Sequence, residues 1–439
     1  MKSIDKIPVT KIERASKIIQ TGAKMGGNYV KYYANRITKT KEEANEILNH
    51  DNAEDLYDGL KSLKGSALKM AQMMSMDKGI LPKAYVEKFS LAQFSVPPLS
   101  GPLIIKSFKK YFGKTPNELF DKFDINAINA ASIGQVHLAE KDRKKLAVKV
   151  QYPGVADSIS SDLALVKPFA LKLLNISSAD ADVYFKEIKD KLIEETDYLN
   201  ELKQAEEISN LSKHIPNMLF PKYYPKLSCD KVITMDWMTG EHLSEFCEKH
   251  AGSAIADKVS QTLWDFYMYQ IHVLKKVHAD PHPGNFLVDN QGNLIVLDFG
   301  CLKFIPDDFY APYFQLTQKE NILNTQKFIQ TLTSLEVIMP NDSQKEIDFL
   351  VNIFKELLTV FTKPFQQEKF DFSNEDFFNE IIQLGERFAK DKDLRNQNGG
   401  RGSKHFIYIN RTFFGLYNLM FDLKSKDIVI DNYKKYIID

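Results

Sequence analysis

Three polar side chains in the second half of the sequence have the types and the spacing that phosphoryl transfer requires. Asp280 is followed five residues later by Asn285, and a second aspartate, Asp298, opens an Asp-Phe-Gly turn. In a kinase-type site such residues supply a base or water-orienting aspartate and two oxygen ligands for Mg²⁺. The order therefore predicts Asp280 in the first role and Asn285 and Asp298 as metal ligands, because Mg²⁺ prefers such oxygens together with those of phosphate.

The segment between these residues predicts a β-hairpin. Two apolar runs, 286–288 and 294–297, flank a turn sequence of Asp, Asn, Gln and Gly at 289–293. A hairpin there would return Asp298 to the side of Asn285, so that both could hold one metal ion. An Asp-Phe-Gly triplet alone occurs by chance, and Asp-rich loops are usually plain turns. In this order, on either side of a hairpin, the residues favour a site.

A lysine earlier in the chain has the setting in which kinases hold the α- and β-phosphates of a nucleotide. Lys149 lies between two valines in an apolar run, and the loop before it has the register of a phosphate-covering loop. Asn129 and Ala131 stand where the first two glycines of such a loop would be, and only Gly134 remains. A lysine alone could be a solubility residue on an edge strand, but this loop favours the phosphate contact. The loop residues expected to contact nucleotide are Ala130, Ala131, Ser132, Gly134, Gln135 and Val136.

A charged helical pattern over residues 178–215 supplies carboxylates for the same chemistry. Glu201 is the candidate partner of Lys149, because kinases orient their phosphate-binding lysine with a glutamate from a neighbouring helix. Glu195 and Asp197 either face the site or are ordinary solvated carboxylates, which is the usual fate of such a run. The pattern leaves both readings open for these two residues.

Residues 232–240 predict a strand that ends in a glycine. Such a strand suits the hinge between two lobes, where backbone groups meet an adenine ring. Met235 and Asp236 are the residues expected at that hinge.

The sequence after Asp-Phe-Gly contains no long activation segment and no Ala-Pro-Glu. Residues 301–306 lead directly into helical patterns over 307–390 and 404–439, with a flexible loop expected at 396–403. In protein kinases the activation segment builds the platform for a peptide substrate. Its absence argues against a protein substrate.

The first 41 residues are basic and predict an amphipathic helix. One reading is an element at a membrane surface. The other is a helix docked on its own domain with its lysines solvated on the opposite side, which is favoured because two glycines weaken an isolated helix. The residues that form its apolar face at three- and four-residue steps are Ile12, Ala15, Ile19, Gly22, Gly26, Val30, Tyr33 and Ile37.

A methionine-rich helix is expected over residues 60–76, after a polar stretch at 40–53 that is a linker or a helix surface. The simplest reading of the methionines is core packing. That reading does not explain Lys69 and Gln72, which lie three residues apart and so share one face in the middle of an apolar helix.

The composition is that of an ordinary globular protein. Lysine plus arginine equals aspartate plus glutamate at 58 each, so no overall field points to nucleic acid. The chain has 439 residues, enough for two or three structural units. Three cysteines without metal spacing, no secretory signal pattern and no apolar run long enough to span a bilayer predict an intracellular, cytoplasmic protein, peripheral at most to a membrane.

Over roughly residues 5–305 the sequence resembles the UbiB/ADCK family of atypical kinases. Residues 130–137 are similar to the family's Ala-rich loop, and 278–285 to its catalytic loop. Glu195 and Asp197 resemble its ExD motif, and 69–72 its KxGQ motif. Two departures are Asn129, in place of the first alanine of the loop, and Ala71, in place of the glycine of KxGQ. Neither removes a nucleotide or metal ligand.

The resemblance implies an α+β, two-lobed protein-kinase-like fold with a helical N-terminal extension over the active site. The expected domains are an extension at 1–112, an N-lobe at 113–240 and a mostly helical C-lobe at 241–439. In this family the Lys and Gln of the extension, here Lys69 and Gln72, meet the ExD carboxylates and occlude protein substrates. An added methyl at Ala71 would lie where that contact is tightest.

The implied ligands are ATP or ADP with Mg²⁺, and the implied activity is slow ATP hydrolysis that supports prenylated-quinone or other isoprenoid lipid metabolism. Expected partners are a lipid or quinone precursor, a membrane surface and quinone-biosynthesis proteins, with no nucleic acid. Two alternatives stay open. One is a small-molecule kinase, which would not need Lys69 and Gln72; the other is a nucleotide-sensing binding module without significant turnover.

Overall fold

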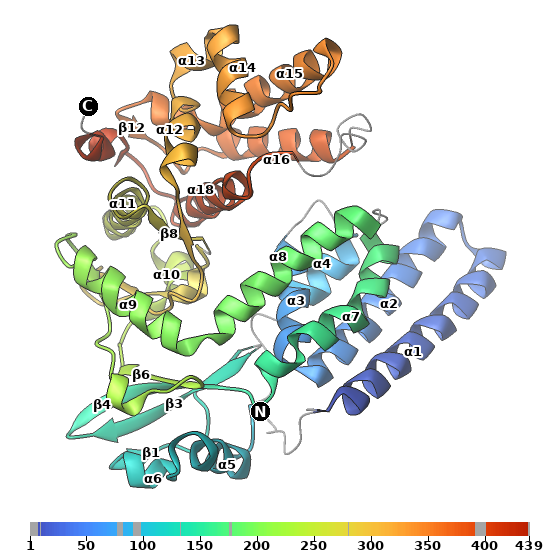
Figure 1. The fold of residues 1–439 in the computed structure, drawn as a ribbon, viewed down its shortest axis with the longest axis vertical. Coiled ribbons are helices and arrows are strands. Elements are labelled where there is room, and N and C mark those ends of the chain that lie inside the picture. Colours follow the sequence, from blue (N-terminus) through green and yellow to red (C-terminus); the bar gives the residue numbers. More distant parts are fainter. Residues whose placement is uncertain are drawn as a thin grey trace. The chain divides into compact units, whose positions relative to one another are not determined.

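The computed structural model divides into two compact units (Figure 1). The first comprises Met1–Leu202 and Lys222–Trp237, and the second Lys203–Pro221 and Met238–Asp439. The helical extension and most of the strands that follow it thus belong to one unit. The residues that the structure describes are 8, 10–76, 82–90, 98–131, 133–174, 178–279, 281–390 and 401–437.

The described residues between 10 and 90 form four helices of the extension, all in the first unit: α1 (Lys11–Thr38), α2 (Lys41–Leu63), α3 (Gly65–Met76) and α4 (Lys83–Ser90). A capping box begins each of the first two helices, with Thr10 and Glu13 for α1 and Thr40 and Glu43 for α2. Helix α2 runs back alongside α1, and α3 packs on α4 and on α7 (Val155–Leu174) (Figure 1). The polar stretch at 40–53 is therefore the first half of a helix.

The helix expected over 60–76 is broken at Lys64. Lys64 and Gly65 both have positive φ, 52° and 59°, a conformation that ends a helix and reverses its direction. The first part of the stretch belongs to α2, and the remainder is α3, which carries Lys69.

Helix α1 docks on its own unit, as favoured from the sequence, but by another face. Its buried residues are Arg14, Ile18, Thr21 and Asn28, which face α2 and α7. Asn28 donates to the Asn52 and Asp55 side chains at 3.2 and 2.8 Å. The expected contact face is largely exposed to solvent: Ile12 82%, Ile19 69%, Val30 70%, Tyr33 69% and Ile37 84%. The periodicity was right about the helix and wrong about the side that packs.

The first unit also contains a five-stranded antiparallel sheet, with the order β1-β3-β4-β6 and β2 added to β3. Its strands are β1 (Lys122–Phe123), β2 (Asn129–Ala130), β3 (Gly134–Lys141), β4 (Lys144–Gln151) and β6 (Val232–Asp236). Helix α5 (Gly101–Phe112) covers it, burying Ile104 and Phe108 against Val148 and Val150. The short helix α6 (Pro116–Leu119) and the 3₁₀ turn η2 (Pro225–Leu227) lie at its margins.

The helix expected over 178–215 is two helices, α8 (Ser178–Thr196) and α9 (Tyr198–Ser212). Asp197 separates them, because its carboxylate accepts from the Asn200 N–H at 3.1 Å and caps α9. The Gln151 side chain donates to the Thr196 carbonyl at 3.0 Å, which supplies a partner at the break. The interruption directs Glu201, in the first turn of α9, towards β4.

The second unit combines a four-stranded sheet, in the order β5-β10-β9-β7, with two short ladders, β8·β11 and β12·β13. The strands are β5 (Met218–Leu219), β7 (Glu241–His242), β8 (Lys276–His278), β9 (Phe286–Val288), β10 (Leu294–Val296), β11 (Leu302–Phe304), β12 (Lys369–Phe370) and β13 (Ile428–Val429). Its helices are α10 (Leu243–His250), α11 (Ala254–Tyr269), α12 (Asp307–Gln315), α13 (Lys319–Leu323), α14 (Thr325–Ser334), α15 (Gln344–Phe361), α16 (Glu375–Lys390) and α18 (Lys404–Asp422). Single turns are η3 (Gln270–Leu274), η4 (Pro283–Asn285), η5 (Lys363–Gln366) and η6 (Asp431–Tyr436).

Helix α11 ends at Tyr269. A π-helical turn, η3, follows it, and Lys275 in the left-handed conformation (φ 51°) starts strand β8. The Gln270 side chain accepts from the His278 N–H at 2.9 Å, which ties the turn to the strand. Cys229, Cys247 and Cys301 are free thiols. Within the described residues, no helix combines the length and the apolar character needed to cross a bilayer.

Candidate active site

Two loops of the second unit carry the residues expected to bind metal and to orient the nucleophile. The Asp280 loop (278–285) begins where β8 pairs with β11, with His278 opposite Leu302. The Asp298 loop (297–301) ends at the same ladder, where Ala279 N–H donates to the Cys301 carbonyl at 2.8 Å. The two loops are therefore held side by side at this end.

The predicted hairpin closes the other end of both loops. Strands β9 and β10 pair antiparallel with Phe286 opposite Val296, and the turn between them contains Gly292 at φ 74°. One step beyond the last pair, Leu297 N–H donates to the Asn285 carbonyl at 2.9 Å. Asn285 and Asp298 are thus brought to neighbouring positions, as the spacing predicted.

The Asp298 loop is fixed by its own contacts. The Asp298 Oδ1 accepts from the Gly300 N–H at 2.7 Å. Phe299 is fully buried, with its ring centroid 6.1 Å from that of Phe220 and 6.2 Å from that of His278. Asp280 lies outside the described residues, so its expected role stays a prediction from the sequence.

Asn285 and Asp298 fit a magnesium ion in the chemistry of their donors, since both offer hard oxygens. Two side chains do not complete the coordination of Mg²⁺, which in nucleotide sites takes the remaining oxygens from phosphates and water. Among the described residues no group of three His, Cys, Asp or Glu side chains could hold a metal without such help. The arrangement therefore suits a metal that arrives with a nucleotide.

The first unit contains the ion pair expected from the sequence. Lys149 Nζ on β4 lies 2.7 Å from Glu201 Oε1 on α9, and Glu201 is 6% exposed. The Lys149 ammonium also lies 5.0 Å from the centre of the Tyr198 ring, which is buried beneath it. Such a cation–π contact adds to the fixation of the lysine. No pattern in the sequence pointed to Tyr198, although this residue directly follows the capping residue Asp197.

The loop before β3 forms a compact hairpin. Ala130 on β2 pairs with Gln135 on β3, and the Ala131 N–H donates to the Gly134 carbonyl at 2.8 Å. A Cβ on Gly134 would lie 2.7 Å from the Val150 carbonyl oxygen. Glycine at this position therefore allows the hairpin to lie directly on β4.

The loop residues expected to meet nucleotide have different surroundings. The Gln135 side chain is buried, accepting from the Leu99 N–H at 2.6 Å and contacting His137 Nε2 at 2.8 Å. Val136 lies opposite Lys149 in the β3·β4 ladder. Ser132 lies outside the described residues. A nucleotide contact by Gln135 would therefore be through its backbone.

The expected contact between the extension and the ExD pattern is present for one of its two carboxylates. Lys69 Nζ on α3 lies 2.9 Å from Glu195 Oε2 on α8, and both side chains are mostly buried. Asp197 is exposed and serves as the cap of α9. The Gln72 side chain lies outside what the structure describes.

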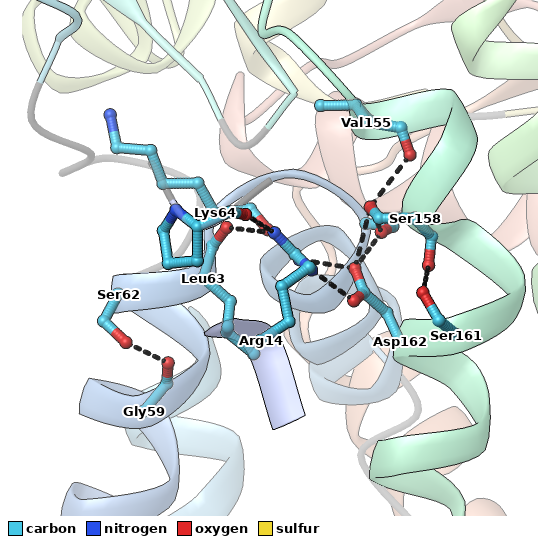
Figure 2. Close-up of polar contacts among 11 residues, drawn as sticks. Arg14, Gly59, Ser62, Leu63, Lys64, Val155, Ser158, Ser161 and Asp162 are labelled. Atoms are coloured by element: carbon cyan, nitrogen blue, oxygen red, sulfur yellow. Dashed lines mark hydrogen bonds and ion pairs between the residues drawn. The ribbon is translucent and has the colours of Figure 1, made fainter. Parts of the chain in front are cut away.

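A buried cluster that the sequence analysis did not identify connects three parts of the first unit (Figure 2). Arg14 of α1 forms two hydrogen bonds with Asp162 of α7, from Nε at 2.6 Å and from Nη2 at 2.5 Å. Arg14 also donates to the Leu63 carbonyl at 3.0 Å, and the Ser66 hydroxyl of α3 donates to Asp162. The cluster therefore holds the α2–α3 junction, one turn before Lys69.

The expected hinge residues lie at the end of β6. Met235 is buried, and the Asp236 Oδ1 accepts from the Tyr224 hydroxyl at 2.8 Å. Burial, together with this hydrogen bond, raises the pKa of Tyr224 to about 12. The Asp236 carboxylate thus stabilises the end of the strand, and an adenine contact there would use the backbone.

Fold and site define a protein-kinase-like protein, with a paired strand lysine and an adjacent Asn and Asp held by a hairpin. The chain belongs to the ABC1 atypical kinase-like domain family, whose model matches residues 91–332. This match confirms the family resemblance and the kinase-like fold class predicted from the sequence.

The curated relatives carry related names. The mitochondrial atypical kinase COQ8 of Saccharomyces cerevisiae is 27% identical over 397 residues, which cover 87% of this chain and 78% of that protein. An uncharacterized chloroplastic aarF domain-containing protein kinase of Arabidopsis thaliana is 30% identical over 284 residues, or 64% of this chain and 40% of that protein. The chain spans about half the length, or less, of three chloroplastic relatives from Arabidopsis thaliana, at 40%, 46% and 49%.

A solved structure has the same fold over most of the chain. The structure of Rv3197 of Mycobacterium tuberculosis, determined with erythromycin, matches with a TM-score of 0.62 at 22% identity. The match covers 91% of this chain and 98% of that one. At this level of identity the likeness establishes the fold alone.

Proposed function

We propose that this chain is an atypical kinase or ATPase that binds ATP or ADP with Mg²⁺ and hydrolyses ATP slowly in support of isoprenoid lipid metabolism. The observation that carries the proposal is the ion pair between Lys149 and Glu201, at 2.7 Å, on a strand next to a compact loop. A mostly buried lysine paired with a glutamate is what a kinase uses to orient its phosphate-binding ammonium.

Each residue has a defined task in this proposal. Lys149 contacts the phosphates and Glu201 holds it in place, while Asn285 and Asp298 hold Mg²⁺. The metal neutralises charge on the phosphates during transfer. Asp280 accepts the proton of the attacking hydroxyl or orients a water. The β2–β3 hairpin, with Ala130, Ala131 and Gly134, covers the phosphates, and the backbone at Met235 and Asp236 meets the adenine.

A protein substrate in trans is not expected. After the Asp298 loop the chain forms only the short strand β11 before helix α12 begins at Asp307. The Lys69–Glu195 pair also ties the extension to α8. Both features favour hydrolysis, or transfer to a small acceptor, over phosphorylation of a folded protein. Resemblance to the UbiB/ADCK family supports a prenylated quinone precursor, or proteins that make it, as the partner.

Helix α1 supports the membrane part of the proposal. Ile12, Ile19, Val30, Tyr33 and Ile37 form an exposed apolar stripe along it. Helix α1 is basic: it contains the single carboxylate Glu13 against the cations Lys11, Arg14, Lys17, Lys24, Lys31 and Arg36. An apolar stripe on a basic helix fits the surface of an anionic bilayer.

The test is Mg²⁺-dependent ATP hydrolysis by the purified protein, with and without anionic liposomes. Lys149→Ala and Asp298→Asn should each abolish turnover, whereas Lys144→Ala, on the exposed start of the same strand, should leave it unchanged. Nucleotide should also raise the melting temperature, because a ligand that binds the folded state stabilises it by mass action. A melting shift without turnover under any condition would replace the enzyme with a nucleotide-sensing module.

A further inference from the structure

Helix α18 touches the Asp280 loop at a point where no side chain fits. Gly415 of α18 lies against Pro281, the residue that follows Asp280 in the sequence. A Cβ built on Gly415 would be closer to Pro281 Cγ than the 3.0 Å that real Cβ atoms keep, 3.3 Å from Cδ and 3.4 Å from the carbonyl oxygen. The proline ring cannot turn away, because it is closed onto its own backbone. Helix and loop therefore meet at this distance only because residue 415 is glycine.

The helix is the fixed partner in this contact. Ile409, Phe413, Leu416, Tyr417 and Met420 of α18 are almost completely buried within the second unit. The Asn410 side chain accepts from the Tyr313 hydroxyl of α12 at 2.7 Å. Well-packed interiors transmit strain rather than absorb it. A side chain added at position 415 would therefore displace the loop and not the helix.

A displacement of Pro281 would reach the candidate metal ligand. The four residues that follow form a tight turn, in which Asn285 N–H donates to the His282 carbonyl at 3.0 Å. Gly284 N–H donates to His282 Nδ1 at 3.1 Å. The same helix reaches the strand after the Asp298 loop, since Lys303 Nζ lies 4.9 Å from the centre of the Tyr408 ring. Helix α18 thus contacts the elements on both sides of the candidate metal ligands.

We propose that Gly415 is a positioning residue: by bringing α18 into contact with Pro281, it sets the place of the candidate metal ligand Asn285 for phosphoryl transfer. In a chain with no long activation segment, this C-terminal helix supplies the support for the loop. This inference rests on the proposed ATPase function where it is tested through kcat. Its second test, amide hydrogen exchange in the Asp280 loop, does not depend on that function.

The experiment compares Gly415→Ala with Gly385→Ala in the full chain. Gly385 lies on α16, is exposed and has nothing within 4 Å of an added Cβ, so it controls for replacing a helical glycine. Gly415→Ala should lower kcat by about 100-fold, the cost of misplacing a reacting group by about 1 Å. Gly385→Ala should keep wild-type kcat. Melting temperatures with and without Mg-nucleotide show whether each variant is folded.

A second change separates positioning from general damage. Pro281→Ala removes Cγ and Cδ, the two ring atoms in conflict, and leaves only the 3.4 Å contact with the carbonyl oxygen. The double variant Gly415→Ala/Pro281→Ala should therefore turn over faster than Gly415→Ala alone, a coupling that unrelated defects do not show. Wild-type kcat in Gly415→Ala, or a loss that Pro281→Ala does not restore, would overturn the inference.

The structural readout keeps the two proposals distinguishable. The hydrogen-bonded backbone amides of Gly284 and Asn285 should exchange hydrogen faster in Gly415→Ala than in wild type, and at the wild-type rate in the double variant. Wild-type protein without turnover would refute the ATPase proposal, while this exchange pattern would still support the contact. Unchanged exchange at these amides in Gly415→Ala would refute the positioning role whether or not the protein hydrolyses ATP.

Discussion

Lys69 and Glu195 join the N-terminal extension to helix α8 through an ion pair of 2.9 Å in which both side chains are largely withdrawn from water. Six residues after Glu195, beyond the cap at Asp197, Glu201 holds Lys149 at 2.7 Å. Two lysine–glutamate pairs, one from the extension and one from the strand, are thus connected by one short stretch of chain. A change that breaks the Lys69–Glu195 pair can therefore alter the Lys149–Glu201 pair through the α8–α9 junction.

Replacing Lys69 by methionine should destabilise the protein strongly. The variant leaves the Glu195 carboxylate buried without its ammonium partner, and breaking a buried pair on one side costs about 3 kcal/mol. Urea unfolding of the wild type and the variant measures the difference. Lys83→Met is the matched control, because its pair with Glu87 is exposed and at 3.7 Å, and pairs of this kind contribute about 0.3 kcal/mol. Equal losses in both variants would contradict the importance of the Lys69 contact.

Breaking the Arg14–Asp162 pair should also destabilise the protein strongly, although these two residues lie even farther apart in the sequence than Lys69 and Glu195. Arg14→Met removes two hydrogen bonds to a fully buried carboxylate and should cost about 3 kcal/mol of unfolding free energy. Arg36→Met, at the exposed end of the same helix, should cost under about 0.5 kcal/mol. Both values come from urea titration.

The paired variant tests the cause. Adding Asp162→Leu to Arg14→Met removes the buried charge and should recover part of the loss, because an apolar pair can replace a buried ion pair at little cost. A double variant less stable than Arg14→Met would mean that Asp162 stabilises the α2–α3 junction chiefly through Ser66 and Ser158, to which it is also hydrogen-bonded.

The sequence predicted the parts of the site that depend on local spacing. The β9–β10 hairpin follows from a turn sequence between two apolar runs, and it brought Asn285 and Asp298 together. Lys149 and Glu201, 52 residues apart, were paired by analogy with kinases, and the structure contains that pair. The roles of these residues in nucleotide and metal binding stay predictions.

What the sequence did not predict depends on contacts between distant residues. Arg14 and Asp162 are 148 residues apart, and neither belongs to a motif. The packed face of helix α1 does not follow from the apolar pattern because that face is largely polar: Arg14, Thr21 and Asn28 are buried, while most of the apolar stripe is exposed. Apolar periodicity finds a helix, but it locates the packed face only when burial is driven by apolar contact.

Acid should destabilise the second unit through His272. Burial lowers the pKa of His272 to about 3 from an ordinary value of 6.5. Its Nδ1 lies 2.6 Å from the Tyr310 hydroxyl, and its ring stacks on Tyr433. In the unfolded chain this histidine takes up a proton below pH 6.5, whereas in the folded state it stays neutral. Stability should therefore fall with decreasing pH across this window, by up to about 1.4 kcal/mol per pH unit.

The measurement is urea unfolding at pH 7, 6, 5 and 4 for the wild type and His272→Asn. The carboxylates contribute equally in the wild type and the variant, so the difference between their slopes of unfolding free energy against pH is due to His272. The variant should therefore lose less stability on acidification. Parallel curves for the wild type and His272→Asn would show that the imidazole is protonated in the folded state as well.

The exposed stripe of α1 should decide whether the protein binds membranes. Replacing Ile19, Val30 and Ile37 by serine deletes three exposed apolar side chains and leaves the face that packs on α2 unchanged. Each such side chain contributes about 2 kcal/mol when fully buried, so sedimentation with anionic vesicles should weaken at least tenfold even at partial burial. Leu323→Ser with Ile382→Ser, two exposed apolar residues of the second unit, is the control and should bind as the wild type does. A wild-type protein that ignores vesicles but forms dimers that the triple variant loses would assign the stripe to a second copy of the chain, and the membrane proposal would fall.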